Sequence, residues 1–353
     1  MLFPLIPLLA AFLFDKLFFI GEVPYYFLNT ASFVNYDHKE ELIFELKDYL
    51  SRKDRKKVVA IFGNSRTTPF NNAYIESKHP DWILFNFSVP GGTSDYYCYL
   101  MEKFQKNNIH PDHMVFAITP QGFNSVSRIQ MDEVMVYALP PSFIARNISH
   151  FSIDDMSNYI AKKLFLGYRN KPLPAVILRR TKNNSRDKEL LKEFIINSKK
   201  ALHDSRGSVA LSKREPKTNR VKMEENAEDI FRDFLSPFQY SKNQHFFMEE
   251  SLKIAVEMKI PSSLLWARVS PELRLLKNEI AFIKTDDGKT ITIRGAWEPR
   301  QRSLAEKYGV KFLDMNDDGN FKCDKFIDAS HMSGICFDDF TDYLFSNIEG
   351  STR

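Results

Sequence analysis

The sequence predicts an α/β protein built on a parallel β-sheet, and two patterns along the chain carry that prediction. Short apolar runs, rich in β-branched and aromatic residues, are typical of buried strands, and they alternate with amphipathic stretches of helical period. Parallel strands need a crossover between them, usually a helix, so this alternation indicates βαβ units. With 353 residues, 43% of them hydrophobic, the chain can bury a sizeable core.

Five core strands are expected, at residues 58–62, 82–87, 114–118, 264–269 and 310–314. Helices are expected mainly at residues 38–50, 94–107, 153–166, 188–196, 249–258, 298–308 and 338–345. Five such strands fit a three-layer, flavodoxin-like sheet with the strand order 2-1-3-4-5, in a domain that spans residues 57–348. The alternation is lost between about residues 125 and 243, which indicates an insertion between strands three and four. An insertion there would lie at the active edge of the sheet and cover a substrate cleft.

Part of this insertion, residues 181–222, is polar and basic, with twelve Lys and Arg against five Asp and Glu. Such a surface fits phosphate-rich polymers or anionic lipid headgroups. Its low apolar content favours the simpler interpretation, a solvated insertion.

The beginning of the chain is its most apolar part. Residues 2–13 are almost wholly apolar, and the run resumes at residues 17–20 after Asp15 and Lys16. A membrane-spanning helix needs about 20 residues, so this stretch just suffices, although charges inside a span are costly unless they snorkel or contact protein. A signal peptide is the alternative, but a basic n-region and a clear cleavage site are missing. We expect an uncleaved anchor at residues 1–22 that contacts the lipid bilayer, with a linker and amphipathic helix at 23–56.

Composition excludes some functions. The net charge of +4 gives weak support for a nucleic-acid partner, and none is expected. The chain carries no phosphate loop or dinucleotide fingerprint, which disfavours a nucleotide-binding protein, and no cofactor is expected. Cys98, Cys323 and Cys336 match neither a zinc pattern nor a dense disulfide framework, so each is expected to be a small buried hydrophobe.

A serine stands where the first strand ends. Residues 57–67 read KVVAIFGNSRT, an apolar run that ends in a Gly-Asn-Ser turn with the serine at position 65. Open α/β sheets place their sites at this end of their strands, although Asn64 and Ser65 also suit a helix cap. Near the C-terminus, Asp328 precedes His331 by three residues. Serine needs a base to become nucleophilic, and the imidazole needs a partner to fix its tautomer, so these residues form a candidate Ser-His-Asp triad.

The order of the triad along the chain, with the serine first and Asp-x-x-His last, resembles the SGNH (GDSL-type) hydrolase family. The turn that ends in Ser65 is similar to the family's Gly-Asp-Ser turn, with asparagine in place of the aspartate. The glycine-rich turn at residues 89–94 is similar to the family's second block. The resemblance implies that the oxyanion is bound by Ser65 and by Gly91, with Gly92 as a near alternative.

The third and fourth blocks differ in how closely they match the family. Where the family has Gly-x-Asn-Asp after strand three, this chain has Thr-Pro-Gln-Gly at residues 119–122. Gln121 matches the asparagine position and can donate the same type of hydrogen bond, and Asn124 is the alternative. The fourth block, from Asp328 to His331, fits closely and is the most specific. The resemblance thus implies Ser65 as the nucleophile and His331 as the base.

An N-terminal anchor with a Gly-x-Ser-Arg turn is similar to envelope members of the family, such as the teichoic-acid D-alanylation and alginate O-acetylation proteins. The resemblance implies a membrane-anchored serine esterase or O-acyltransferase acting on acyl groups of a cell-envelope polymer, with a membrane acyltransferase as a further partner. It also implies a single-pass protein of the bacterial inner membrane with an extracytoplasmic domain. Lys16, Lys39 and Lys47 instead favour a cytoplasmic domain under the positive-inside rule. A noncatalytic protein that binds an envelope glycan or partner is the alternative.

Two arginines are candidate substrate-binding residues. Arg66 follows the nucleophile, and Arg268 lies at the end of the fourth strand; a structural ion pair is the alternative for both. Residues 314–319 have the opening spacing of a calcium loop, but Lys325 stands where the bidentate glutamate belongs. An Asx-rich turn is therefore expected there, and no metal site.

Overall fold

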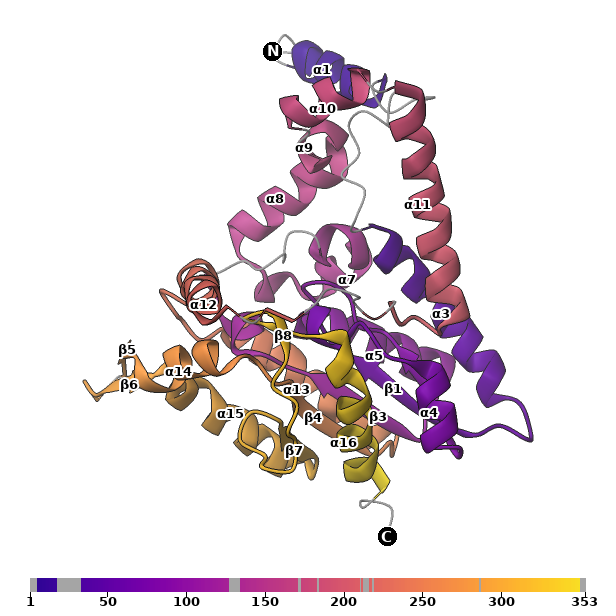
Figure 1. The fold of residues 1–353 in the computed structure, drawn as a ribbon. Coiled ribbons are helices and arrows are strands. Elements are labelled where there is room, and N and C mark those ends of the chain that lie inside the picture. The colour runs from indigo at the N-terminus through magenta and orange to yellow at the C-terminus, as the bar shows by residue number, and fades with distance from the viewer. Residues whose placement is uncertain are drawn as a thin grey trace.

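A five-stranded parallel sheet lies at the centre of the protein (Figure 1). The computed structural model describes residues 5–17, 33–126, 134–170, 173–182, 184–209, 211, 216–217, 219–285 and 287–349. The strands of the sheet are β1 (Lys57–Phe62), β2 (Trp82–Asn86), β3 (His113–Ala117), β4 (Ser262–Trp266) and β7 (Lys311–Asp314). Their order is β2-β1-β3-β4-β7, and every neighbouring pair is parallel. The predicted order 2-1-3-4-5 is confirmed, because β7 is the fifth strand of this sheet along the chain.

Burial on both faces explains why the strands read as continuous apolar runs. All residues of β1 to β4 except Lys57 are buried. The Phe62 ring lies between those of Phe87 and Phe116, at centroid distances of 5.5 and 5.2 Å. The fourth strand ends three residues earlier than predicted. The apolar run in the sequence is longer than the strand because Ala267 and Val269, which follow the last paired residue, are also buried. Apolar burial therefore continues past the strand and into the turn.

Helices cover both faces of the sheet (Figure 1). On one face α5 (Ser94–Asn107) packs against α13 (Lys242–Glu257), which in turn contacts α15 (Ile293–Tyr308). On the other face α4 (Asn72–Lys78) packs against α16 (Phe337–Glu349). The remaining helices of the body are α3 (Phe33–Leu50), α7 (Pro141–Arg146), α12 (Arg220–Phe234) and α14 (Pro271–Glu279). Helices on alternate faces are what right-handed crossovers between parallel strands produce.

Short elements complete the body. The 3₁₀ turns are η1 (Ser65–Thr67), η2 (Pro120–Phe123), η4 (Ile148–His150) and η5 (Gly334–Cys336), and η3 (Val134–Ala138) is a π-helix. Two hairpins lie outside the sheet, β5 (Ala281–Lys284) with β6 (Thr290–Thr292), and β8 (Phe326–Asp328) with β9 (His331–Met332). The turns η1 and η2 follow β1 and β3 directly, at the carboxyl edge of the sheet.

The helices of the predicted insertion project from one side of the body (Figure 1). The insertion contains α8 (Ile153–Leu164), α9 (Leu166–Asn170), α10 (Pro174–Lys182) and α11 (Asn184–Asp204), and α12 returns the chain to the sheet (Figure 1). The described part of the basic stretch is largely helical and docks on the body, because α11 packs against α3 and His203 Nδ1 lies 2.8 Å from Glu45 Oε1. Residues 183, 210, 212–215 and 218 of that stretch lie outside the described residues.

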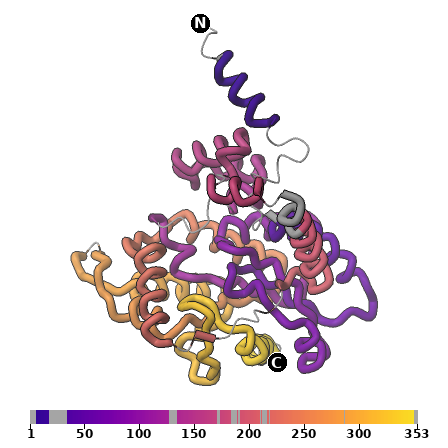
Figure 2. The backbone as a smooth tube through the Cα atoms, turned by 45° about the horizontal axis from the view of Figure 1, so that its top comes forward, coloured from indigo at the N-terminus to yellow at the C-terminus, as the bar shows by residue number. Residues whose placement is uncertain are grey.

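The predicted membrane anchor is described only over α1 (Leu5–Leu17), a helix of 13 residues. Residues 1–4 and 18–22 of that prediction lie outside the described residues. Within the described ranges, every helix is too short or too polar to span a bilayer. Figure 2 shows α1 projecting beyond the helices of the insertion, at the end of the molecule opposite the C-terminus.

The charged pair at the end of α1 contacts protein. The Asp15 carboxylate accepts hydrogen bonds from the backbone N–H groups of Leu166 and Gly167, at 2.7 Å each, and so caps α9. The Lys16 ammonium donates to the carbonyl oxygen of Leu164. These contacts satisfy both charges and fix α1 to the insertion, while its apolar side chains are exposed: Ile6, Leu8, Leu9, Leu13, Phe14 and Leu17.

Candidate active site

Ser65, His331 and Asp328 lie together at the carboxyl edge of the sheet. Ser65 begins η1 directly after β1, while Asp328 ends β8 and His331 begins β9. Ser65 Oγ is 2.7 Å from His331 Nε2, although the two residues are 266 positions apart in the chain. His331 Nδ1 is 2.9 Å from Asp328 Oδ1 and 3.0 Å from Oδ2. A serine nucleophile, its base and an orienting carboxylate require this chain of hydrogen bonds.

The turn after β1 leaves the Ser65 hydroxyl available for the imidazole. Asn64 is the cap of η1, because its side-chain oxygen accepts a hydrogen bond from the N–H of Arg66 at 3.1 Å. The sequence allowed Ser65 to be either a nucleophile or a helix cap, and in the structure Asn64 makes the cap. Gly63 is required for the turn to be this tight, since a Cβ there would lie 2.0 Å from Thr67 Oγ1.

The Asp328 carboxylate fixes the tautomer of His331. Burial acts to raise the pKa of Asp328, but hydrogen bonds from the imidazole and from the backbone N–H groups of Ser330 and His331 outweigh it and lower the pKa to about 2. The carboxylate is therefore ionised at neutral pH and can only accept. His331 Nδ1 must then carry the proton, and the lone pair of Nε2 faces Ser65 Oγ.

Three N–H groups beside the serine are free to bind an oxyanion. Gln121 Nε2 is buried and has no hydrogen-bond partner among the described residues. The amide oxygen faces Arg66, whose Nη1 lies 3.4 Å away; a guanidinium cannot accept, so this contact leaves Nε2 as the free end. The backbone N–H groups of Ser65 and Gly91 border the same pocket, and neither donates within the described residues. Gly91 has a φ of 69°, which favours glycine.

The neighbouring Gly92 has a steric role. A Cβ at this position would lie 2.1 Å from the carbonyl oxygen of Gly63, so the two turns approach each other too closely for any side chain. Gly92 N–H donates to the carbonyl oxygen of Val89 at 3.1 Å. Of the two glycines considered from the sequence, Gly91 is the one with a free N–H.

Asn124 is not placed to bind an oxyanion. Its Nδ2 donates to the carbonyl oxygens of Phe234 and Pro237, at 3.1 and 2.9 Å, and its Oδ1 accepts from Gln239 N at 3.0 Å. The amide is thus fully engaged by backbone, and the residue does not line the pocket. The alternative prediction for Asn124 is corrected accordingly, because η2 directs Gln121 toward the pocket and Asn124 toward the insertion.

Arg66 connects the turns that form the site. The side chain is buried, and its Nε donates to the carbonyl oxygen of Ser330 at 3.0 Å while Nη1 reaches Gln121. Burial lowers the pKa of Arg66 to about 10, and the nearby Asp328 opposes that shift. Arg66 lines the pocket, but two of its donor groups hold protein acceptors. Its contacts therefore fit a positioning role beside Ser65 better than the predicted binding of an anionic substrate.

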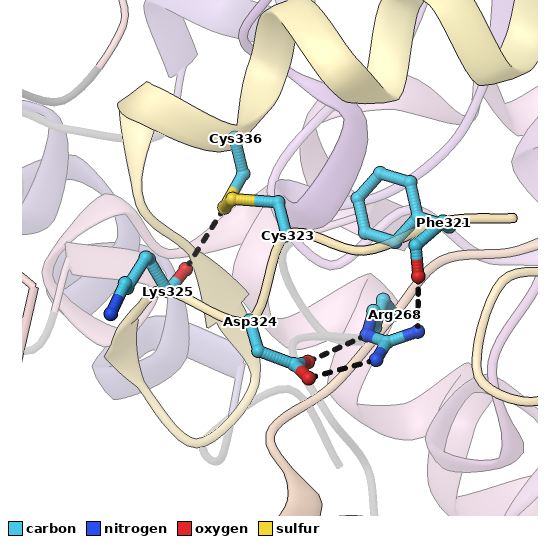
Figure 3. Close-up of a disulfide and its surroundings, with 6 residues drawn as sticks. All are labelled: Arg268, Phe321, Cys323, Asp324, Lys325 and Cys336. Carbon is cyan, nitrogen blue, oxygen red and sulfur yellow. Dashed lines mark hydrogen bonds and ion pairs between the residues drawn. A yellow bond between two sulfur atoms is a disulfide. The ribbon is translucent and has the colours of Figure 1, made fainter. Parts of the chain in front are cut away.

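Arg268 lies outside the pocket, in a structural ion pair (Figure 3). Its Nε and Nη2 are 2.8 and 3.0 Å from the two carboxylate oxygens of Asp324, and Nη1 donates to the carbonyl oxygens of Met315 and Phe321. The structure thus favours the ion-pair interpretation over substrate binding. The loop that begins at Asp314 makes the expected Asx turn, since Asn316 N donates to Asp314 Oδ1 at 2.9 Å.

A disulfide closes the loop that carries the histidine and the aspartate. Cys323 and Cys336 are bonded to each other (Figure 3), and residues 328 and 331 lie between them along the chain. The prediction that each cysteine is a small buried hydrophobe is wrong for this pair. It is confirmed for Cys98, which is buried and free. By closing this loop, the disulfide restricts the conformations open to the segment that carries Asp328 and His331.

The insertion reaches the pocket through α12, in keeping with its predicted place at the active edge of the sheet, but the sequence did not indicate which of its residues line the pocket. Ile230 and Phe234 line the pocket together with Ser65 and His331. Asn226 Oδ1, on the same helix, accepts a hydrogen bond from the N–H of Ala329 at 2.8 Å. Positions 226, 230 and 234 are four residues apart, so they share one face of the helix. That spacing is the signal by which the sequence could have revealed them.

The residues described offer no cluster of three His, Cys, Asp or Glu side chains able to hold a metal ion. The residues that converge on the pocket are instead a serine, a histidine, an arginine and neutral donors. This arrangement can activate a hydroxyl and stabilise an oxyanion, which are the two requirements of acyl transfer.

The lowered pKa of Asp328 predicts a pH-dependent contribution to stability. A carboxyl whose pKa falls on folding stabilises the native state above its unfolded pKa, and this contribution is lost as the pH falls through the folded value. We expect the difference in unfolding free energy between the wild type and Asp328→Asn to shrink as the pH falls from about 4 to about 2. Urea titrations followed by tryptophan fluorescence measure it. A difference that stays constant down to pH 2 would contradict the assignment.

No curated protein matches the chain significantly. One family model does match, over residues 1–348, and its description is "Protein of unknown function (DUF1574)". Because the match covers nearly the whole sequence, the triad, the insertion and α1 all fall within it. The chain belongs to the DUF1574 family.

Proposed function

We propose that this protein is a serine esterase or O-acyltransferase of the SGNH type, acting on acyl groups of a cell-envelope polymer. The observation that carries the proposal is the hydrogen-bond chain from Ser65 Oγ through His331 to Asp328, with distances of 2.7 and 2.9 Å. Capping alone does not account for this chain, because Asn64 already caps the turn. The free amide of Gln121 beside the serine supports the same conclusion.

In the proposed reaction, Ser65 Oγ attacks the carbonyl carbon of an ester or thioester while His331 Nε2 takes the hydroxyl proton. The resulting imidazolium is stabilised by the Asp328 carboxylate. The carbonyl oxygen becomes an oxyanion, which accepts from Ser65 N, Gly91 N and Gln121 Nε2. When the tetrahedral intermediate collapses, the bond to the leaving group breaks, and His331 returns the proton to that group. An acyl-Ser65 remains.

The second half of the reaction uses the same residues. His331 removes a proton from water or from a sugar hydroxyl, and the resulting oxygen nucleophile attacks the acyl-Ser65 carbonyl. Collapse of the second intermediate breaks the bond to Ser65 Oγ, which regains its proton from His331. Water as the acceptor gives hydrolysis, and a sugar hydroxyl gives transfer.

We also propose that the domain faces an oxidising compartment outside the cytoplasm, held at a membrane through its N-terminal segment. The bond between Cys323 and Cys336 supports this location, because disulfides persist mainly in oxidising compartments. The exposed apolar side chains of α1 support contact with a bilayer or with a membrane partner. Charges near a membrane segment are costly unless they contact protein, and Asp15 and Lys16 both make hydrogen bonds to the insertion.

A fluorophosphonate probe tests for the activated serine. We expect the full-length wild type in detergent to be labelled, Ser65→Ala to lose labelling, and His331→Ala to react roughly 10²- to 10⁴-fold more slowly, because the base is lost. Ser77→Ala is the matched control, since Ser77 is exposed and its hydroxyl donates only to the carbonyl oxygen of Tyr74. Equal labelling of wild type and Ser65→Ala, both folded by circular dichroism, would contradict the proposal.

Thiol trapping tests the compartment. Cells that express the full-length protein are quenched in acid, and the denatured protein is treated with a maleimide-polyethylene glycol with and without a reductant. We expect one modified cysteine, Cys98, before reduction and three after it, since Cys323 and Cys336 are bonded. Three modified cysteines without reductant would place the domain in a reducing compartment.

A further inference from the structure

Three side chains of helix α12, at positions 226, 230 and 234, form the row that faces the pocket, and a hydrogen bond at each end of this row fixes the helix beside the triad. Near the middle of the helix, Asn226 Oδ1 accepts from Ala329 N at 2.8 Å, inside the turn that joins Asp328 to His331. At its end, the carbonyl oxygen of Phe234 accepts from Asn124 Nδ2 at 3.1 Å. The helix also packs along α14. The side chains between these contacts therefore form a rigid wall opposite the nucleophile.

The wall limits the size of the group that Ser65 can receive. The pocket has a volume of about 140 Å³, and its apolar side is made by Ile230 and Phe234. A cavity of about 150 Å³ holds one benzene molecule, so roughly six carbon atoms fill such a space. A substrate must also place its carbonyl group inside. Within the pocket itself, the remaining room accommodates an acyl chain of about two to four carbons in total, and a longer chain must extend past Ile230 and Phe234 toward solvent.

The charges around the pocket disfavour a cationic acyl group. Among the described residues that line it, Arg66 and His331 are basic and none is acidic. The nearby Asp328 carboxylate is engaged by His331 and by the N–H of Ser330. An ammonium on the acyl group would lie near a guanidinium, and near an imidazolium during the reaction, with no carboxylate to pair with it. The hydrocarbon surface of Ile230 and Phe234 favours an uncharged chain.

We propose that Ile230 and Phe234 determine which acyl group the enzyme transfers, and that this group is short and uncharged rather than aminoacyl. The proposal rests on the proposed function, because it assigns the acyl side of that same site. It makes α12 the specificity element, and it makes Asn226 a positioning residue that ties this element to the catalytic turn.

The test compares kcat/KM for p-nitrophenyl acetate, butyrate, hexanoate, octanoate and alanyl ester with full-length enzyme. We expect the wild type to prefer acetate and butyrate and to turn over the octanoate and the alanyl ester at least about tenfold less efficiently. Phe234→Ala is expected to raise the hexanoate-to-acetate ratio at least about tenfold by opening the wall. Phe231→Ala is the matched control, because Phe231 lies on the same helix with its ring 5.9 Å from Phe282, outside the pocket lining.

A second variant narrows the pocket and guards against misfolding of the first. Ile230→Phe is expected to lower the butyrate-to-acetate ratio, in the direction opposite to Phe234→Ala. The inference would be overturned if both folded variants kept the chain-length ratios of the wild type, or if the wild type preferred the octanoate or the alanyl ester. Neither result would contradict the proposed role of the triad. Absence of turnover with every ester, together with absence of phosphonate labelling, would overturn the proposed function and this inference with it.

Discussion

The parallel pairing of β1 with β2 and β3 is the constraint on which the site depends. Parallel strands bring their carboxyl ends to one edge, so the turns that carry Ser65, Gly91 and Gln121 meet there. The fourth turn, with Asp328 and His331, comes from outside the sheet. The hydrogen bond from Ser270 N to Ala329 O and the contacts of α12 hold it against the edge, and a disulfide closes its loop.

The buried guanidinium of Arg66 joins these two parts. Burying a cation is costly unless acceptors surround it, and here the Ser330 carbonyl and the Gln121 amide oxygen accept its hydrogen bonds. The same contacts orient the groups of the proposed site: one is made to the turn that carries His331, and the other leaves the amide nitrogen of Gln121 without a partner among the described residues. A polar network that stabilises the fold thus also prepares the pocket for negative charge.

Sequence patterns predicted the sheet and the proximity of Ser65, His331 and Asp328, because both rest on local signals. Buried strands read as apolar runs, Ser65 stands in a short motif at the end of one of them, and Asp328 and His331 share a short motif near the C-terminus. Partners chosen by tertiary distance were harder to predict. Cys323 and Cys336 gave no framework spacing, although the fold brings them together. In the sequence, the apolar side chains of α12 cannot be told from ordinary core positions, because only the fold places this helix beside Ser65. The directions of the Gln121 and Asn124 side chains after β3 depend on the 3₁₀ turn η2.

The central claim is that the turns of this site form a preorganised oxyanion hole around an activated serine. A crystal structure of the protein after reaction with an ethyl fluorophosphonate, which releases fluoride as Ser65 Oγ bonds to phosphorus, tests it most directly. The account predicts phosphorus bonded to Ser65 Oγ and a phosphonyl oxygen about 3 Å from Ser65 N, Gly91 N and Gln121 Nε2. A phosphonyl oxygen that points to solvent, with the Gln121 amide bonded elsewhere, would contradict it.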